Sequence, residues 1–243
     1  MFKKFSAYTL AMLLIPVVTW LANWQWSSAI QYHDFDFDYF LFLITETGSF
    51  PYAAITCVIF TLLLAWVVRK RYSLFLVITV CVASMLSTQI IKSGMKSVYQ
   101  EPRPFVTAFF ADKTEAFYQL ERAQRTEEVI KYIGEKENFV TRHQSKEVGY
   151  SFPSGHTIFA VSWLLLVVGL CMNMRGQAVI FAHIFAISWA ALMLISRLRL
   201  GMHYPIDLFV SSLLAFVVNL ALFIWFLPWL EKRNPFNLFH KRV

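Results

Sequence analysis

The chain has 243 residues, a net charge of +7, and a composition that is 58% hydrophobic and only 15% charged. A soluble domain carries about 25% charged residues, so this chain has too little charge to cover a globular surface in water. The composition excludes an ordinary soluble domain and indicates a protein with much of its surface in lipid.

Six apolar segments approach the length of about 20 residues that a helix needs to cross the hydrocarbon core. They predict membrane spans at residues 5–24, 51–68, 72–91, 157–172, 178–195 and 206–229. The first could instead be a cleaved signal peptide, because Lys3 and Lys4 precede it. Its apolar stretch exceeds the usual ~7–15 residues and no convincing cleavage site follows, which favours a retained helix. We expect an all-α integral membrane protein with one domain, residues 1–243.

A polar segment at about residues 101–150 separates the third and fourth spans. Fifty residues is long for a structureless connection, although a solvated linker is the alternative. Its apolar residues can form a stripe along helices, which predicts a helical insert across the outer face. The stripe consists of Phe117, Leu120, Val129, Ile130 and Ile133.

The charges of the loops predict the orientation. Basic residues lie at the ends of apolar segments, and no basic helix face with interleaved aromatic residues occurs outside them, so we expect no nucleic-acid partner. The loop after the first span is acidic instead. By the positive-inside rule both termini are cytoplasmic, and the insert lies on the outer side. The basic positions are Lys3–Lys4, Arg69–Arg71, Arg175, Lys232–Arg233 and Lys241–Arg242.

Residues 196–207 concentrate charge in the outer loop before the last span. His203 and Asp207 are four residues apart, a spacing at which side chains meet on a helical turn. Pro205 suits the first helical position, so Asp207 would lie in the first turn. Such a carboxylate can accept a hydrogen bond from one imidazole nitrogen and leave the other free as a nucleophile. The alternative is that Asp207 only caps the helix.

A second cluster, Phe152-Pro153-Ser154-Gly155-His156, immediately precedes the fourth span. A small polar turn that enters a helix presents unpaired backbone N–H groups, which suit a phosphate oxyanion. His156 at that position could protonate a leaving alkoxide. The alternative is an ordinary helix N-cap at Ser154.

A third cluster ends the third span, where Lys96 is followed by Arg103-Pro104. Cations at this depth commonly extend to lipid headgroups. Their functional interpretation is a phosphate clamp, in which the Arg103 fork binds two oxygens. Lys92 lies one turn before Lys96 and could share its face.

All three clusters fall at the outer ends of spans three to six in the topology derived from loop charge. Two histidines, at least two arginines, a lysine and a single carboxylate suit phosphoryl transfer, because cations can neutralise the charge of the transferred group. No cluster of carboxylate, histidine or cysteine ligands suggests a metal site. We therefore predict no metal and no other cofactor.

These strings resemble the three signatures of the type 2 phosphatidic acid phosphatase superfamily, in order and at every signature position. They are K-x6-R-P at Lys96–Pro104, P-S-G-H at Pro153–His156 and S-R-x5-H-x3-D at Ser196–Asp207. The strings at residues 100–106 and 196–208, and the long insert, are also similar to bacterial members that act on phosphatidylglycerol phosphate. The resemblance spans most of the chain.

The resemblance implies His203 as nucleophile, Asp207 as its orienting partner, and His156 as general acid and later base. The residues that would bind the phosphate are Lys96, Arg103, Ser154, Gly155 and Arg197. It also implies a metal-independent enzyme in the bacterial inner membrane, with its active site on the periplasmic face and no obligate protein partner. The implied substrates are phosphatidylglycerol phosphate, phosphatidic acid, lysophosphatidic acid, diacylglycerol pyrophosphate and undecaprenyl pyrophosphate.

Other functions remain open at this level. The same motifs would serve an enzyme that acts mainly on undecaprenyl pyrophosphate, or a lipid phosphotransferase of the same superfamily. A transporter or scaffold would need the three clusters to be coincidental, and no inverted repeat or pair of broken spans supports transport. A vanadate-dependent haloperoxidase would share the phosphate pocket but belongs to soluble members.

Overall fold

The computed structural model describes residues 1–233, apart from the side chain of Lys136, and every regular element within that range is a helix. Lys241–Arg242, part of the charge pattern used for orientation, lies outside the described residues. The longer elements are α1 (Phe2–Leu21), α2 (Phe37–Glu46), α3 (Tyr52–Val68), α4 (Leu74–Tyr99), α5 (Pro104–Phe110), α6 (Thr114–Gln119), α7 (Arg122–Ile133), α8 (Phe139–Lys146), α9 (Gly155–Leu170), α10 (Gln177–Arg199), α11 (Pro205–Ala221) and α12 (Leu227–Glu231). A π-helical turn, Leu222–Phe226, joins α11 to α12.

Four of the described segments are long and apolar enough to cross a membrane: Phe2–Leu21, Leu74–Gln119, Gln177–Arg199 and Pro205–Glu231. The second contains α4 and also runs into the insert. Two shorter apolar helices, α3 and α9, complete the bundle. The all-α class is confirmed, and each predicted span corresponds to one helix or helical segment of this bundle.

The apolar outer faces of the bundle explain the low charge content. Large apolar side chains on α1, α3 and α10 are more than half exposed, as expected for helices whose outer surface meets lipid tails. Examples are Leu10, Leu14, Ile55, Leu62, Ile180 and Phe181.

The centre of the bundle is α9, which packs against α1, α4, α10 and α11. Nearly all of its 16 residues are buried, so the helix is apolar on every side rather than amphipathic. At 1.5 Å per residue it is about 24 Å long, shorter than the hydrocarbon core of about 30 Å. α9 alone is therefore too short to cross the full hydrocarbon core.

A buried polar contact ties three helices of the bundle together. Asn219 of α11 accepts a hydrogen bond from Ser84 of α4 at 2.8 Å and donates one to Ser162 of α9 at 3.1 Å. All three side chains are inaccessible to solvent. Amide and hydroxyl groups in such positions are costly unless they pair, and when paired they hold transmembrane helices together.

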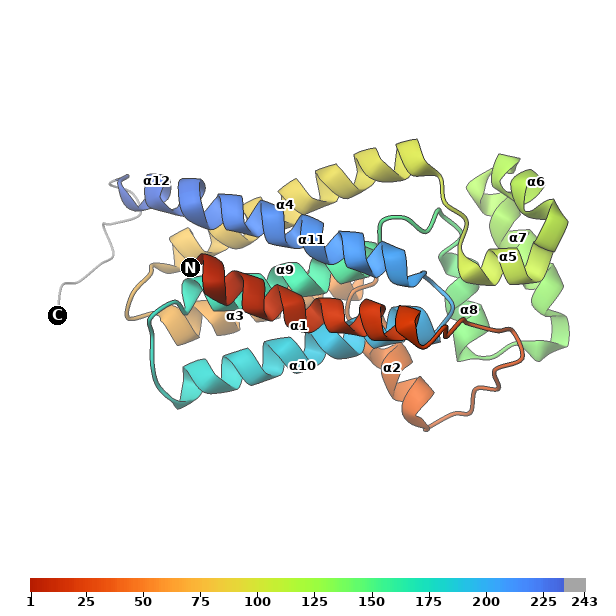
Figure 1. Ribbon diagram of the computed structural model, residues 1–243, viewed down its shortest axis with the longest axis horizontal. Coiled ribbons are helices and arrows are strands. Elements are labelled where there is room, and N and C mark those ends of the chain that lie inside the picture. Colours follow the sequence, from red (N-terminus) through yellow and green to blue (C-terminus); the bar gives the residue numbers. More distant parts are fainter. Residues whose placement is uncertain (234–243) are drawn as a thin grey trace.

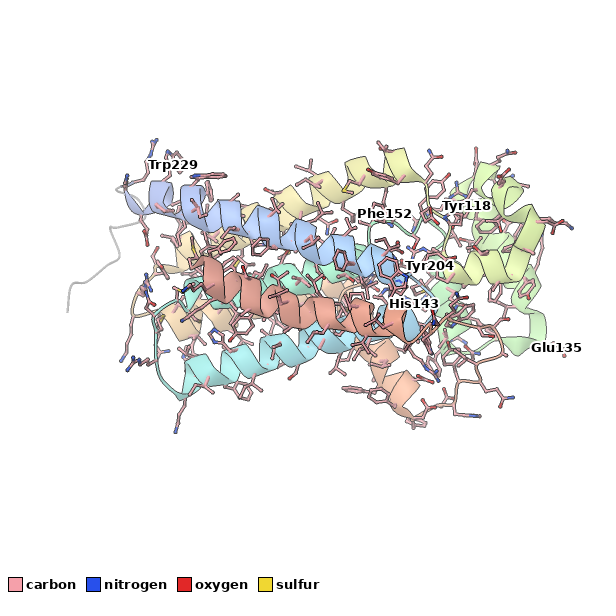
Figure 2. All side chains as sticks on the ribbon, in the orientation of Figure 1. Tyr118, Glu135, His143, Phe152, Tyr204 and Trp229 are labelled. Carbon is pink, nitrogen blue, oxygen red and sulfur yellow. The ribbon has the colours of Figure 1, made fainter. Side chains whose placement is uncertain are left out.

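The insert covers one end of the bundle, opposite the end at which α1 begins and α12 ends (Figure 1). The loops that join α3 to α4 and α9 to α10 also lie at the end where α1 begins, away from the insert. Figure 2 shows Trp229 at that end and Tyr118, His143 and Tyr204 where the bundle meets the insert. This arrangement places the two ends of the described chain on the same side of the bundle.

The insert packs onto the loop that precedes α11. Its apolar core includes Phe105, Val129 and Val140, together with Leu200 and Met202 of that loop. The backbone N–H of Phe105 donates to the Gly201 carbonyl at 3.1 Å, and the Gln144 side chain donates to the Leu200 carbonyl at 2.9 Å. The insert thereby fixes the loop that carries His203.

The apolar stripe predicted for the insert is correct only in part. Phe117, Val129 and Ile133 are buried, but Ile130 is 55% exposed. Ile130 follows Val129 directly, and adjacent residues on a helix point about 100° apart, so both cannot face one core. The helices are therefore present, with a narrower apolar face than the sequence suggested.

Two elements depart from the predicted span boundaries. The third span was expected to end at residue 91, but α4 continues to Tyr99, since the polar residues that follow Ile91 leave the apolar window without breaking the helix. A ten-residue helix, α2, lies in what was taken as the first outer loop. Asp36 caps it by accepting hydrogen bonds from the backbone N–H groups of Asp38 and Tyr39.

Candidate active site

The three sequence clusters meet at the end of the bundle that faces the insert. Lys96 comes from the end of α4, Arg103 from the turn before α5, His156 from the start of α9, and His203 from the loop before α11. These four side chains and Gly155 line one cavity of about 470 Å³. Of the remaining predicted residues, Ser154, Arg197 and Asp207 do not line the cavity and support it from behind.

His203 is held by two residues on one side of its ring. Its Nδ1 lies 3.1 Å from Asp207 Oδ2 and 3.3 Å from Ser151 Oγ, and the Ser151 hydroxyl also donates to Asp207 Oδ2. The backbone N–H of Tyr204 donates to the same oxygen at 3.0 Å. An ionised Asp207 can only accept, so Nδ1 carries the proton and the lone pair belongs to Nε2, which faces the cavity side. Asp207 thus both caps α11 and orients the imidazole.

The surroundings keep His203 neutral. Its side chain is almost fully buried, and burial together with the nearby Arg103 and Arg197 guanidinium groups holds the pKa of its imidazole well below its ordinary value. Its Nε2 lies 3.4 Å from Arg103 Nη1. A neutral imidazole with an unprotonated Nε2 is the form that can act as a nucleophile.

The position of His203 also depends on a tight turn. Its backbone N–H donates to the Arg197 carbonyl at 3.2 Å, which closes the turn after α10. Gly201 within this turn has a φ of +70°, a left-handed conformation that favours glycine. A Cβ there would also collide with the Trp26 indole.

Arg103 lines the cavity, and three groups fix its guanidinium. Its Nε donates to the Gly149 carbonyl at 2.7 Å and its Nη1 to the Met202 carbonyl at 3.1 Å. Its Nη2 forms an ion pair with Glu147 Oε2 at 2.8 Å. A fully buried guanidinium needs such partners, because an unpaired charge away from water is costly.

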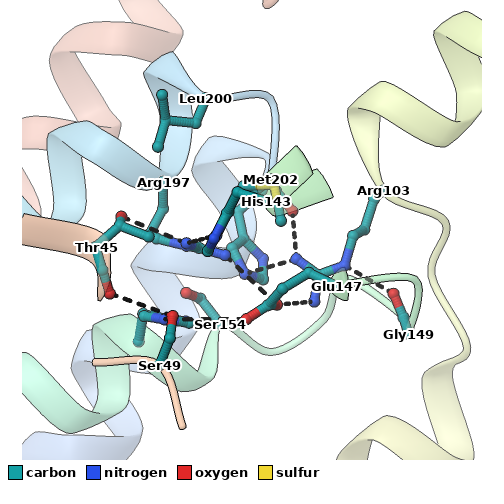
Figure 3. A network of polar contacts seen from close by, with 12 residues as sticks. Thr45, Ser49, Arg103, His143, Glu147, Gly149, Ser154, Arg197, Leu200 and Met202 are labelled. Carbon is teal, nitrogen blue, oxygen red and sulfur yellow. Dashed lines mark hydrogen bonds and ion pairs between the residues drawn. The ribbon is translucent and has the colours of Figure 1, made fainter. Parts of the chain in front are cut away.

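Glu147 lies between the two arginines (Figure 3). Its Oε2 contacts Arg103 at 2.8 Å and lies 3.6 Å from Arg197 Nη2, and its Oε1 lies 4.0 Å from His156 Nε2. Partial burial opposes its ionisation, yet Arg103 and the other neighbouring cations hold the pKa of its carboxyl well below its ordinary value. The site thus binds an internal anion, and the expectation of a single carboxylate was wrong.

Arg197 is completely buried behind the cavity. Its Nη1 donates to His143 Nε2 at 3.1 Å and lies 3.4 Å from Thr45 Oγ1. Its Nε and Nη2 have no hydrogen-bond partner. Nη2 lies 3.6 Å from Glu147 Oε2, an ion pair too long for a hydrogen bond, so a closer acceptor oxygen would satisfy this donor.

His156 faces Glu147 across the cavity from Arg103. Its Nε2 lies 3.0 Å from Ser49 Oγ, on the turn between α2 and α3. A Cβ on Gly48 would lie 2.7 Å from His156 Cδ2, so the imidazole occupies space that only a glycine leaves free. The α2–α3 turn is therefore shaped around His156.

Ser154, Gly155 and the lysines complete the site. The Ser154 side chain caps α9 by accepting from the Thr157 N–H at 3.3 Å, the N-cap role that was the alternative for this motif. A Cβ on Gly155 would lie 3.0 Å from Lys92 Cδ, so Lys92 extends over the start of α9. Lys96 Nζ donates to the Tyr150 carbonyl at 2.5 Å. Lys92 and Lys96 both line the cavity, as their shared helix face predicted.

Comparison with known proteins gives the family. The model of the PAP2 superfamily matches residues 77–231. The chain belongs to the PAP2 superfamily. This confirms the resemblance drawn from the three signatures, and all eight predicted site residues lie within the matched range.

The similar curated members of the PAP2 superfamily are phosphatases by name. Phosphatidylglycerophosphatase B of Haemophilus influenzae is 43% identical over 92% of this chain and 95% of its own length. Phosphatidylglycerophosphatase B of Escherichia coli K12 and that of Shigella flexneri are each 36% identical over 85% of this chain and 82% of their own length. This PAP2 chain is accordingly an enzyme of the phosphatase class.

Sequence reasoning missed five side chains that contact the site of this PAP2 enzyme. Glu46 and Ser49 lie outside the matched range, whereas His143, Glu147 and Ser151 lie within it. Ser151 directly precedes the Phe152–His156 cluster, a position that could have suggested it. Nothing in the local sequence distinguishes Glu147 from the other acidic residues of the insert.

Proposed function

We propose that this PAP2 enzyme removes the terminal phosphate from a membrane lipid, with phosphatidylglycerol phosphate as the first candidate substrate. The observation that carries the proposal is the single cavity lined by His203, His156, Arg103 and Lys96. The names of the similar phosphatases support the choice of lipid. A buried cation cluster that already holds one carboxylate can exchange it for a phosphate.

In the proposed first step, the His203 Nε2 lone pair attacks the phosphorus atom and the bond to the lipid oxygen breaks. The His203–Asp207 contact keeps the attacking nitrogen unprotonated and stabilises the cationic ring that forms. Lys96, Arg103 and Arg197 would neutralise the equatorial oxygens, and the capped start of α9 at Ser154 and Gly155 would add backbone N–H groups. His156, in its protonated form, donates a proton to the leaving oxygen and is left neutral.

In the proposed second step, His156 takes a proton from water, and the resulting hydroxide attacks the phosphohistidine. The P–N bond breaks, phosphate leaves, and His203 returns to its neutral form. In this scheme no proton or charge is left over, and none of the steps requires a metal ion. A phosphate that contacts Arg103 and Arg197 would displace Glu147 from its present ion pair.

The walls of the cavity support a lipid rather than a soluble substrate. Besides the cations, the cavity is lined by apolar groups of α3, α4 and α9 and by Phe50, which precedes α3 and is 90% exposed. Such walls suit acyl chains and discriminate weakly, because one methylene is worth only about 1–3 kcal/mol. We therefore expect several lipid phosphates to be accepted. The apolar lining residues are Phe50, Ala53, Ala54, Cys57, Met85 and Phe159.

The substrate is tested by product release in matched bilayers. Purified enzyme is assayed in EDTA with phosphatidylglycerol phosphate, undecaprenyl pyrophosphate and a soluble sugar phosphate, and phosphate and dephosphorylated lipid are both measured. We expect turnover of both lipids with kcat/KM highest for phosphatidylglycerol phosphate. A tenfold advantage for undecaprenyl pyrophosphate, about 1.4 kcal/mol, would reverse the ranking. Activity confined to the sugar phosphate would contradict the lipid assignment, and transfer of phosphate to a second lipid would indicate a phosphotransferase.

We further propose six membrane crossings, with both termini cytoplasmic and the insert and cavity on the periplasmic face. The basic ends of α1, α3 and α12 lie at the end of the bundle away from the insert, which supports this orientation. α3 and α9 would be the two short crossings, and the rigid packing of α9 against four longer helices supports its inclusion.

The orientation predicts an all-or-none labelling pattern. In a variant without the three native cysteines, a cysteine at Glu135 should react with an impermeant maleimide in cells whose outer membrane is permeable. A cysteine at Gln177 should react only after the inner membrane is opened. Both side chains are exposed, at opposite ends of the bundle, so accessibility within the protein does not bias the comparison. The reverse pattern would place the cavity in the cytoplasm.

A further inference from the structure

The buried Arg197 is held by groups that lie outside the three signatures. Its Nε and Nη2 make no hydrogen bond, and Nη2 has only the ion pair with Glu147 at 3.6 Å, whereas Nη1 is directed at His143 Nε2 at 3.1 Å. Thr45 lies 3.4 Å from the same nitrogen. These contacts at Nη1 fix the orientation of the planar guanidinium, and with it the direction of Nε and Nη2.

His143 is itself fixed from the opposite side. Its Nδ1 lies 2.8 Å from Glu46 Oε1, at the end of α2, and the imidazole is 3% exposed. The Phe42 ring packs against the imidazole edge to face at 5.9 Å. The imidazole therefore has one partner at each nitrogen and a fixed ring plane.

The proton positions of this chain follow from the donors. A guanidinium has only N–H donors, so His143 Nε2 must be the acceptor in its contact with Arg197. The Nδ1 proton must then be donated to Glu46, which accepts it. Burial lowers the pKa of the His143 imidazole, and the contact with Glu46 only partly opposes this, so the neutral form is favoured. Glu46, His143 and Arg197 thus form a directed chain that ends at the ion pair with Glu147, which lines the cavity.

We propose that His143, oriented by Glu46, is a positioning residue that directs the Nη2 donor of Arg197, now ion-paired with Glu147, at the substrate phosphate. The inference rests on the proposed phosphatase site and adds to it two residues from the insert and α2. The proposal gives the insert a role in the chemistry. Its helix α8 supplies the hydrogen-bond acceptor for Arg197, and none of the described membrane helices supplies one. His143 touches no reacting atom in this scheme and acts only through Arg197.

The test measures the affinity for a phosphate mimic rather than turnover. Orthovanadate is titrated into the purified full-length enzyme in detergent, and its dissociation constant is measured by calorimetry for the wild type, His143→Leu and His143→Gln. Leucine removes the acceptor and should raise the dissociation constant about tenfold, which is about 1.4 kcal/mol. Glutamine keeps an acceptor oxygen near the place of Nε2 and should stay within about threefold.

A double-mutant comparison separates positioning from packing. In an Arg197→Gln background, His143→Leu should have little further effect on vanadate affinity, because the group that His143 positions is already lost. A residue needed only for packing would reduce the fraction of folded enzyme, and so kcat, in either background and leave the dissociation constant unchanged. Arg142→Gln on the exposed face of α8 is the matched control and should behave as the wild type.

The outcomes are distinguishable. If His143→Leu does not fold, Glu46→Ala is measured in its place and should weaken vanadate binding several-fold by freeing the imidazole. Unchanged vanadate affinity in the folded variant would overturn the positioning role while the phosphatase proposal stands. Absence of vanadate binding in the wild type would refute the phosphate site itself, and the inference with it.

Discussion

Replacing His203 by alanine is expected to lower kcat by about 10⁴-fold or more, because the residue supplies the nucleophile and nothing else in the cavity can replace it. Substrate binding should change little, since Lys96, Arg103 and Arg197 remain. The measurement is steady-state hydrolysis of phosphatidylglycerol phosphate, together with the dissociation constant of orthovanadate. Normal turnover in this variant would end the covalent mechanism.

The phosphoenzyme gives a second readout of the same prediction. Rapid quenching of the wild type with labelled substrate should trap a phosphate that is stable in base and labile in acid, as phosphohistidine is, and His203→Ala should trap none. His156→Ala should form the intermediate slowly and also break it down slowly, because one residue serves both steps. His33→Ala, which changes an exposed histidine between α1 and α2, is the matched control and should show wild-type kinetics.

Contacts within one short segment could be predicted from the sequence. His203 and Asp207 meet because their spacing of four residues and Pro205 define the first turn of α11. The same holds for the N-cap at Ser154, which a small polar residue before an apolar run indicates. In both places the interacting groups lie within five positions of each other, so local rules suffice.

Contacts between distant segments could not be predicted in the same way. His143 and Arg197 are separated by 54 residues and Ser49 and His156 by 107, and no periodicity connects them. They meet only because the insert folds back over the bundle and α2 ends beside α10. The search for membrane spans also required about 20 apolar residues, so a ten-residue helix such as α2 was invisible to it.

Glu147 shows why the prediction of a single carboxylate in the site was wrong. No acidic residue of the insert was predicted to belong to the site. Glu147 does belong to it, because α8 ends one residue before it and directs its carboxylate inward, between two buried guanidinium groups. A cluster of buried cations requires such a counter-charge when no substrate is present. This requirement could not be predicted from the sequence, because only the structure shows that the cations lie together.

Replacing Asp207 by asparagine is expected to lower kcat by about 10³-fold, somewhat less than the ~10⁴-fold loss known for the equivalent change in serine protease triads. Asparagine keeps the size of the side chain and one oxygen that can still cap α11. It removes the negative charge that stabilises the imidazolium. The N–H groups of its amide can also face the donors that now bind the carboxylate, and those donors then lack an acceptor. Three donors converge on Asp207 Oδ2, from His203, Tyr204 and Ser151. The measurement is kcat for phosphatidylglycerol phosphate alongside the melting temperature.

The comparison with Ser151→Ala decides what Asp207 does. If Asp207 only caps the helix, asparagine should leave kcat within a few-fold and the melting temperature near that of the wild type, because asparagine caps a helix about as well as aspartate does. If it orients His203, kcat should fall at an unchanged melting temperature. Ser151→Ala removes one of the donors to the carboxylate but leaves the charge and the His203 contact in place, so its kcat should fall by about tenfold or less. A loss in Ser151→Ala as large as that in Asp207→Asn would mean that the serine hydroxyl, rather than the carboxylate charge, fixes the imidazole.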